Sequence, residues 1–319
     1  MPSNSPKFIY LAALAIIIIT TTLLIGNNNK NMQTTSLSST TISPTNLTQS
    51  SNTIKHVIIV VIENREYSNI ISSLNAPYEN SLASKYVLAT NYFAISHPSE
   101  PNYIAMIAGS TLNITNDGNV SQNQKSATNL VDLFKTKNVS WKAYEESMPT
   151  PCDTNDSSDG LYVTKHNPFV YMIDITNNLT YCENHVVKLT QFYNDLTNNQ
   201  LPQYAFITPN MNDDGHSTSI AFADNWLSTF IPTIINSSSF ESSIIFLTYD
   251  EGTTNLGGGG HIATIIIGPN SILKQSFKTQ IAYSHYSLLT TIESIYRIGN
   301  LSREDANAAI MSDIFVTAK

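Results

Sequence analysis

Charged residues are scarce in this chain of 319 residues, and most of them are acidic. Only 13% of the residues are charged, and 24 acidic against 16 basic residues give a formal net charge of -8. Binding of nucleic acid relies on Lys and Arg that displace counterions from phosphates, and no basic stripe occurs here. We therefore expect no nucleic-acid partner. An anionic ligand would have to be held by local features such as a metal ion, a helix N-terminus or histidines.

Cysteine is almost absent, since the chain has only Cys152 and Cys182. In an exported protein, two cysteines favour a disulfide across the intervening loop. Two unrelated buried thiols are the alternative. Whether the two cysteines are interpreted as a disulfide or as free thiols therefore depends on whether the protein is exported.

The longest apolar run, residues 8–25, reads FIYLAALAIIIITTTLLI and carries no charge. As a helix it would extend about 27 Å, roughly the thickness of the hydrocarbon core of a bilayer. Lys7 precedes the run and the next charge is Lys30, so the positive-inside tendency places the N-terminus in the cytoplasm. No clean small-x-small cleavage site follows. The run is either a transmembrane anchor, which we slightly favour, or a cleaved signal segment.

Residues 1–7 form a short flank before this run, and residues 26–54 follow it as a linker. The linker is rich in Asn, Ser, Thr and Gln and cannot bury a core. Asn-x-Ser/Thr sequons, the acceptors of glycosylation in exported chains, give modest further support to an extracytoplasmic, membrane-anchored or secreted protein. They lie at Asn46, Asn113, Asn119, Asn138, Asn155, Asn178, Asn236 and Asn300.

Residues 55–319 alternate short β-branched runs with segments of helical periodicity. This pattern predicts one α/β domain with a doubly wound, mainly parallel central sheet and helices on both faces. The expected strands are 56–62, 141–144, 203–208, 243–249 and 262–267. The expected helices are 102–108, 127–136, 186–196, 220–235 and 286–298.

Polar side chains follow three of the expected strands at the point where each strand ends. Glu63 and Asn64 follow the first, the segment Asp214-Gly215-His216 comes shortly after another, and Asp250 and Glu251 follow a third. The carboxyl ends of parallel strands meet at one edge of a sheet. Glu63, Asn64, Asp250 and Glu251 would form an oxygen-rich set suited to a divalent cation. Helix-capping acids and solvated loop ends are the alternative.

Ser99 precedes an apolar helical run in the segment HPSEPNY. A serine there is usually an N-cap, but a metal ion could also activate its hydroxyl as a nucleophile. Asn102, one helical turn later, could donate to a phosphoryl oxygen or be an ordinary first-turn residue.

Histidines and glycines supply the remaining candidates. His216 follows an Asp-Gly pair and His261 follows the glycine run 257–260; either could ligate a second metal or protonate a leaving group. Lys165 and His166 offer two further phosphate donors. The glycine run lacks the Lys-Ser/Thr ending of a phosphate-binding loop. We therefore interpret it as a mobile lid rather than as a loop that binds phosphate.

An ordered set of segments across residues 55–299 carries a family likeness. They are VVIENREYSNII, NYFAISHPSEPNYIAMIAGS, YEESMPTPC, YVTKHNPFVY, ITPNMNDDGHS, LTYDEG, GGGGH and YSHYSLLTTIESIYRI. Together they resemble the phosphoesterase family of acid phosphatases and bacterial phospholipases C, within the alkaline phosphatase superfamily. The pattern with MPTPC and KHNPF is closer to the acid phosphatases.

The resemblance implies an alkaline-phosphatase-like fold and one or two divalent metal ions. It implies that Glu63, Asn64, Ser99, Asp250 and Glu251 bind the catalytic metal, with Ser99 also attacking phosphorus. It further implies that His166, Asp214, His216 and His261 line the phosphate site as donors, second-metal ligands or general acid.

We therefore predict hydrolysis of a small-molecule or lipid phosphate monoester through a phosphoserine intermediate. Phospholipase C or another phosphodiesterase activity at the same site is one alternative. A surface-anchored binding protein that has lost catalysis is another, from a different functional class.

Overall fold

The computed structural model describes residues 54–317, which fall within one compact unit of the chain. The predicted flank, the apolar run 8–25 and linker residues 26–53 lie outside the described residues and stay predictions. Ile54, which we placed at the end of the linker, is only 7% exposed and packs in the core. None of the described helices is long and apolar enough to span a bilayer.

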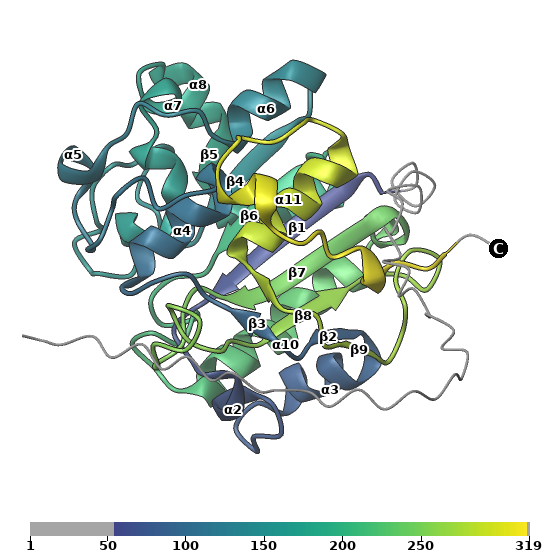
Figure 1. Cartoon of the computed structure of the whole chain (residues 1–319). Coiled ribbons are helices and arrows are strands. Elements are labelled where there is room, and N and C mark those ends of the chain that lie inside the picture. The colour runs from purple at the N-terminus through teal and green to yellow at the C-terminus, as the bar shows by residue number, and fades with distance from the viewer. Residues whose placement is uncertain (1–53, 318–319) are drawn as a thin grey trace, which may run out of the picture. The chain divides into compact units, whose positions relative to one another are not determined.

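The core is an eight-stranded sheet with the order β5-β4-β6-β1-β7-β8-β2-β9 (Figure 1). Central β1 reads HVIIVVI, is buried beyond its first residue, and pairs in parallel with β6 and β7. Among the strands within residues 54–317, only β8 runs antiparallel to its neighbours in this sheet. The strands are β1 (His56–Ile62), β2 (Val87–Ala89), β4 (Trp141–Glu145), β5 (Val186–Lys188), β6 (Tyr204–Thr208), β7 (Ser243–Tyr249), β8 (Thr264–Ile267) and β9 (Phe277–Thr279). The mainly parallel α/β sheet is thus confirmed.

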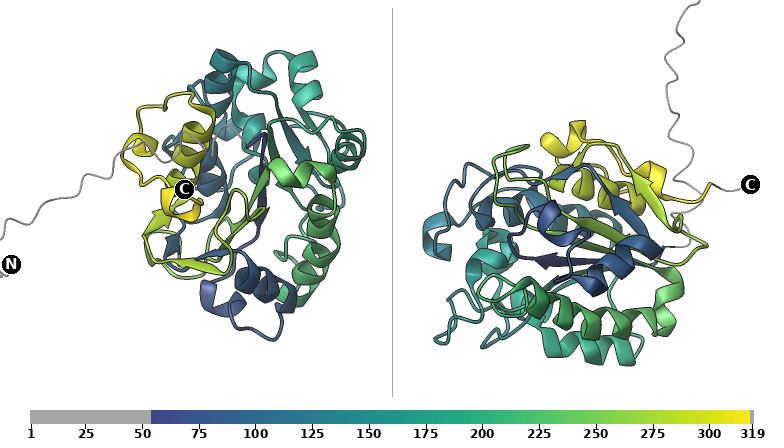
Figure 2. Two further views of the ribbon diagram at one scale, coloured as in Figure 1. Left: turned by 90° about the vertical axis from the view of Figure 1, so that its right-hand side faces the viewer. Right: turned by 90° about the horizontal axis from the view of Figure 1, so that it is seen from below.

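Helices cover both faces of this sheet (Figures 1 and 2). The α-helices are α2 (Tyr67–Ile70), α3 (Pro77–Lys85), α4 (Ser99–Ala108), α5 (Val120–Asn123), α6 (Leu130–Lys137), α7 (Ile173–Thr176), α8 (Leu179–His185), α9 (Leu189–Thr197), α10 (Ile220–Ile235) and α11 (His285–Tyr296). A small second sheet pairs β3 (Tyr92–Phe93) with β10 (Tyr283–Ser284). The 3-10 turns are η2 (Thr164–His166), η3 (Pro168–Tyr171), η4 (Ser238–Ser242), η5 (Glu304–Asn307) and η6 (Ser312–Ile314).

Helices α4 and α11 lie on one face of the sheet, and α9 and α10 lie on the other (Figure 2). All ten residues of α4 are buried. On the opposite face, the rings of Phe192 from α9 and Phe230 from α10 lie 5.4 Å apart. Helix α10 buries residues three and four positions apart, as its sequence periodicity predicts.

The predicted helix 186–196 is wrong at its start, because Val186–Lys188 form strand β5 and helix α9 begins at Leu189. Val186 and Val187 pair in parallel with Ala143 and Tyr144 of β4. Adding a strand to the sheet edge places these β-branched side chains on a pleated surface, where they pack well. Tertiary pairing therefore prevails over local periodicity here.

Cys152 and Cys182 form a disulfide with their Cα atoms 5.5 Å apart, which confirms the predicted pair. The bridge closes the excursion between β4 and β5, and Cys152 N–H also donates to the Val186 carbonyl at 2.9 Å. The same excursion carries Lys165 and His166 in η2. The disulfide thus constrains the segment that presents these two side chains.

We expect the double substitution Cys152→Ser/Cys182→Ser to lower the free energy of unfolding by roughly 3–4 kcal/mol, because the unfolded chain regains loop entropy. Urea unfolding of both proteins measures the difference. Wild-type protein treated with a reductant should match the double variant. Two thiols that react in the untreated native protein would contradict the disulfide.

The carboxyl groups of Glu293 in α11 and Asp305 in η5 lie close to each other near the C-terminus. Asp305 in η5 accepts the N–H groups of Leu301 at 2.6 Å and Arg303 at 2.9 Å. Glu293 of α11 is 2% exposed, and its oxygens have no hydrogen-bond partner among the described residues. Burial and the adjacent Asp305 raise the pKa of Glu293 to about 9. This shift favours the protonated form of Glu293 in the folded protein at neutral pH.

This shift predicts that stability falls as pH rises from about 4.5 towards 9, since the unfolded Glu293 ionises while the folded one keeps its proton. Glu293→Gln should remove this loss, which amounts to at most about 1.4 kcal/mol per pH unit. Urea unfolding across that range should give similar stabilities for variant and wild type at pH 4 and a more stable variant at pH 8. Parallel pH profiles would refute the protonated carboxyl.

Candidate active site

Three strands deliver acidic residues to one buried point at the carboxyl edge of the sheet. Glu63 follows β1 and Asp250 follows β7, while Asp214 lies in the loop after β6. Glu63 N–H donates to the Asp214 carbonyl, and Asp250 N–H donates to the Ile62 carbonyl, each at 3.0 Å. Parallel pairing of β1 with both neighbours places these chain segments side by side.

Ser99 is the first residue of α4, and its hydroxyl faces these carboxylates rather than the helix backbone. Its Oγ donates to Glu63 Oε2 at 3.1 Å and lies 3.4 Å from Glu251 Oε1. The N-cap position belongs to Pro98, and no side chain caps the helix. The N-cap interpretation of Ser99 is therefore wrong.

Glu63 is fully buried at the centre of the cluster. Its Oε1 accepts the Tyr103 hydroxyl at 2.6 Å and lies 3.2 Å from His166 Nε2. Burial raises the pKa of Glu63 well above its usual range, and the nearby Asp250 and Asp214 raise it further. A lone ionised carboxylate is therefore costly here unless positive charge accompanies it.

His166 lies between two carboxyl groups, with Nδ1 3.4 Å from Asp214 Oδ2 and Nε2 facing Glu63. Burial, followed by the charge of Lys165, lowers the pKa of His166 well below its usual value. A neutral imidazole offers one donor and one acceptor, so it cannot donate to both carboxylates. His166 Nε2, Asp214 Oδ2 and Asp250 Oδ2 are all buried without a hydrogen-bond partner among the described residues.

These unpartnered atoms fit a divalent cation. Ligand atoms of Glu63, His166 and Asp214 all lie within 4.8 Å of one another. In the protein alone, burial and Glu251 raise the pKa of Asp250 to about 7, and burial raises that of Asp214 to about 7. A divalent cation would relieve this repulsion and suits a mixed set of carboxylate and imidazole ligands.

Asn64, one of the predicted metal ligands, contacts the cluster through its backbone. Its N–H donates to Asp250 Oδ1 at 3.1 Å, with the backbone at a φ of 20°. Its side-chain Oδ1 accepts Arg65 Nη1 at 2.9 Å. The amide oxygen of Asn64 as a metal ligand stays a prediction.

Asn102 and His261 have contacts typical of packing residues, so the phosphate role predicted for each finds no support in them. The Asn102 amide holds the preceding loop: Oδ1 accepts the N–H groups of Ile95 and Ser96, and Nδ2 donates to the Ser96 and Pro98 carbonyls. The His261 ring stacks 4.4 Å from that of Tyr67, and its Nε2 lies 3.1 Å from the Thr90 carbonyl oxygen.

The glycine run before His261 packs closely against the loop that leads to Ser99. A Cβ on Gly258 would lie 2.3 Å from the Ile95 carbonyl oxygen, and one on Gly259 would lie 2.4 Å from that of Ser96. Gly258 also adopts a φ of +112°. Close backbone approach therefore explains these glycines better than the lid that we expected.

His216 and Lys165 flank the buried cluster and are both half-buried. His216 N–H donates to Asp214 Oδ1 at 2.7 Å, and its ring lies 6.0 Å from that of His166. Lys165 Nζ donates to Asp117 Oδ2 at 3.0 Å. Burial alone would lower the pKa of Lys165, but Asp117, Glu63 and Asp250 raise it, so a positive charge is retained beside the cluster.

Sequence reasoning missed four residues that contact this site. Tyr103 donates to Glu63, and Asp117 accepts the Glu100 N–H at 3.0 Å beside Ser99. His97 contacts Glu251 through Nδ1. The fully buried His285 lies with Nε2 2.6 Å from the Asp250 carbonyl oxygen. His97, Tyr103 and His285 lie within the family-like segments, whereas Asp117 lies outside them and has no local signal.

A family model described as "Phosphoesterase family" matches residues 72–299. A probable acid phosphatase of Kluyveromyces lactis is 33% identical over 267 residues, which cover 81% of this chain and 62% of that protein. A phosphatidylinositol-3-phosphatase of Mycobacterium tuberculosis is 31% identical over 263 residues, 82% of this chain and 83% of that protein. The chain spans about three fifths of the length of the fungal relatives it matches.

The fold also has a solved counterpart. A protein in the alkaline phosphatase superfamily from Vibrio parahaemolyticus superposes with a TM-score of 0.56. The match covers 79% of this chain and 70% of that one at 13% sequence identity, so the likeness is one of fold.

The contact of His285 with the Asp250 carbonyl generates a prediction about cation binding. We expect His285→Leu to weaken divalent-cation affinity by about 10–100-fold, because the Asp250-Glu251 peptide loses the ring that orients it. His285→Gln, whose amide can replace Nε2, should recover most of this loss. Isothermal titration with Mn²⁺ measures both variants, with circular dichroism as the control for folding. An unchanged Mn²⁺ affinity in His285→Leu would show that His285 does not contribute to cation binding.

Proposed function

Because the chain belongs to the phosphoesterase family, we propose that it is a metal-dependent phosphatase that hydrolyses phosphate monoesters through Ser99. The observation that carries this proposal is the buried Ser99 hydroxyl, which contacts Glu63 and Glu251 at the end of a fully buried helix. The curated relatives are named as acid phosphatases and a phosphatidylinositol-3-phosphatase, which supports the same reaction class.

In the first step, Ser99 Oγ attacks phosphorus and its proton passes to one of the two carboxylates that it already contacts. When bound, a divalent cation would lower the pKa of the serine hydroxyl and stabilise charge on the phosphoryl oxygens. Glu63, Asn64, Ser99, Asp250 and Glu251 are the proposed ligands. Glu63, His166 and Asp214 also form a group whose ligand atoms lie within 4.8 Å of one another and could hold an ion. The Ser99–phosphorus bond forms while the bond to the alcohol oxygen breaks.

In our proposal His216 gives the departing alcohol its proton. It is half-buried, and Asp214 fixes its backbone beside the buried cluster. In the second step, water attacks the phosphoserine and releases phosphate, restoring the Ser99 hydroxyl. Lys165 and the N-terminal end of α4 add positive potential where the phosphoryl group carries negative charge.

The proposed substrate is a small-molecule or lipid phosphate ester, and the phosphatidylinositol-3-phosphatase relative supports the lipid alternative. We propose an extracytoplasmic location, which the Cys152–Cys182 disulfide supports because such bonds persist in oxidising compartments. Attachment to a membrane through residues 8–25 remains part of this proposal.

The central test is Ser99→Ala. Turnover of p-nitrophenyl phosphate should fall by about 10³-fold or more, because the covalent path is lost. Acid-quenched wild-type protein should carry a phosphate adduct on the peptide that contains Ser99, detected by mass spectrometry. A chelator should abolish wild-type turnover, and a divalent cation should restore it.

Ser110→Ala is the matched control, since Ser110 follows the other end of α4 and its Oγ accepts the Leu112 N–H. Its turnover should stay within about threefold of wild type. A folded, metal-loaded Ser99→Ala protein with near wild-type turnover would refute the serine nucleophile.

A further inference from the structure

The side chain of Arg65 joins the segment after β1 to the loop that follows β6. Its Nη1 donates to the carbonyl oxygen and to the side-chain Oδ1 of Asn64, at 3.0 and 2.9 Å. Its Nη2 donates to the carbonyl oxygens of Gly215 and Thr218, at 2.7 and 3.2 Å. The two terminal nitrogens of one guanidinium thus bind two chain segments that lie 150 residues apart in the sequence.

His216 lies between the two loop residues that Arg65 holds. Its N–H donates to Asp214 Oδ1 at 2.7 Å, which fixes the backbone but not the ring. Within the described part of the chain, the half-buried ring has one hydrogen-bond contact, from Nδ1 to the Oγ of the exposed Ser217 at 3.4 Å. The position of the ring therefore depends mainly on the loop backbone, which Arg65 binds on both sides of His216.

The loop after β6 otherwise closes on itself, since the Ser217 N–H donates to the Met211 carbonyl at 2.8 Å. Among the described hydrogen bonds, those that tie residues 215–218 to another part of the fold come from Arg65. If these bonds were lost, the segment could shift as a unit. His216 would move with it.

The contacts of Arg65 require the shape of a guanidinium rather than its charge alone. A guanidinium is planar and presents N–H groups on separate nitrogens, whereas a lysine ammonium donates from a single nitrogen at the end of a flexible chain. All four acceptors of Arg65 are neutral oxygens, and within residues 54–317 no ion pair involves it. Arg65→Lys therefore removes the fork and keeps the positive charge.

Building on the proposed function, in which His216 protonates the departing alcohol, we propose that Arg65 is the positioning residue for this proton transfer. The proton passes from a His216 ring nitrogen to the alcohol oxygen as the bond between that oxygen and phosphorus breaks. Arg65 acts through the backbone of residues 215–218, which it holds to the end of β1. A general acid must lie within hydrogen-bond reach of the oxygen that it protonates, so a small shift of the loop slows the transfer.

The test compares two phosphate monoesters whose alcohols differ in their need for a proton. p-Nitrophenolate leaves as a stable anion, whereas the alkoxide of glycerol phosphate must be protonated as it departs. The quantity measured is kcat/KM, which covers the steps up to phosphoserine formation, in which the alcohol leaves. In the full-length chain at saturating Mn²⁺, Arg65→Lys should lower kcat/KM by about 10–100-fold for glycerol phosphate and by less than about threefold for p-nitrophenyl phosphate. Equal losses for the two esters would overturn the proposal.

Arg303→Lys is the matched control, because it removes a similar fork away from Ser99. Arg303 Nη1 donates to the carbonyl oxygens of Ala108, at the other end of α4, and Thr128. This variant should lose stability but keep the wild-type ratio of the two kcat/KM values. The same change of ratio in Arg303→Lys would overturn the proposal, since general loosening of the fold would then explain it. If Arg65→Lys fails to fold, Arg65→Gln replaces it with the same expected ratio.

The bond from Arg65 to Asn64 Oδ1 offers a rival route, through a proposed cation ligand. Titration with Mn²⁺ separates the two routes. A weaker Mn²⁺ affinity in Arg65→Lys, together with an unchanged ester ratio at saturating Mn²⁺, would show that Arg65 acts through Asn64. That result would overturn its role in positioning His216.

His216→Gln separates failure of this inference from failure of the proposed function. It should reproduce the loss that is specific to glycerol phosphate. The double variant Arg65→Lys/His216→Gln should lose little more than His216→Gln alone, because both changes act on one proton transfer. Fully additive losses in the double variant would overturn the proposal.

If His216→Gln lowers kcat/KM equally for both esters, or if the chain hydrolyses neither, the proposed function fails in that respect. Hydrogen exchange then still tests whether Arg65 holds the loop. The Ser217 amide should exchange at least about tenfold faster in Arg65→Lys than in wild type and should be unaffected in Arg303→Lys. Unchanged exchange in Arg65→Lys would refute the anchoring of the loop.

Discussion

Repulsion among buried carboxyl groups at the end of β1 is the constraint on which the arrangement around it depends. Glu63, Asp214 and Asp250 reach one point because β1 pairs in parallel with β6 and β7. Burial of like charges costs free energy unless hydrogen bonds or positive charge compensate. Tyr103, Ser99 and the Asn64 N–H supply the hydrogen bonds, and a divalent cation fits the oxygens left over.

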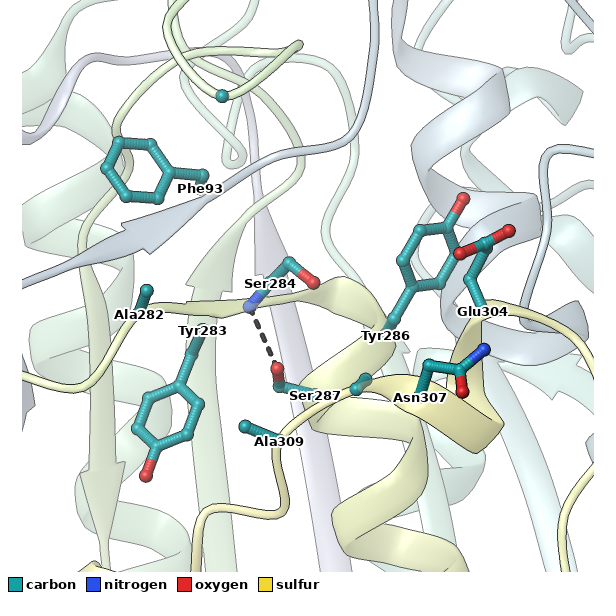
Figure 3. A pocket seen from close by; sticks show the side chains of 11 residues that line it. Phe93, Ala282, Tyr283, Ser284, Tyr286, Ser287, Glu304, Asn307 and Ala309 are labelled. Carbon is teal, nitrogen blue, oxygen red and sulfur yellow. Dashed lines mark hydrogen bonds between the residues drawn. The ribbon is translucent and has the colours of Figure 1, made fainter. Parts of the chain in front are cut away.

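The starts of helices α4 and α11 both contact this group of carboxyl-bearing segments. The start of α4 brings Ser99 to the carboxylates, and the start of α11 brings His285 to the Asp250 backbone. Both helices lie on the same face of the sheet (Figure 1). The first turn of α11 also lines a surface pocket together with Phe93 and Ala309 (Figure 3).

Several features of the fold and site could be predicted from sequence because they depend on local pattern. The apolar run of β1, the periodicity of α10 and the strand ends that carry Glu63 and Asp250 all have local signals. Others lacked one. Strand β5 follows from pairing with β4, and Asp117 could not be assigned to the site, because a contact across the fold leaves no mark in the neighbouring sequence. Tyr103 lies in the segment HPSEPNY, but nothing in that segment indicates its contact with Glu63.

By itself, the sequence determined a mainly parallel α/β domain and its acidic strand ends, and it favoured a disulfide between its two cysteines. These follow from hydrophobic periodicity, cysteine count and the shared edge of parallel strands. Only the tertiary structure decided that Ser99 faces Glu63 rather than capping α4, and that His166 lies between two carboxyl groups. It also placed the Asn102 amide against the Ile95 N–H and the His261 ring against Tyr67. The physical reason is that a side chain's role depends on its neighbours in space, which strand order and helix packing bring together from distant parts of the chain.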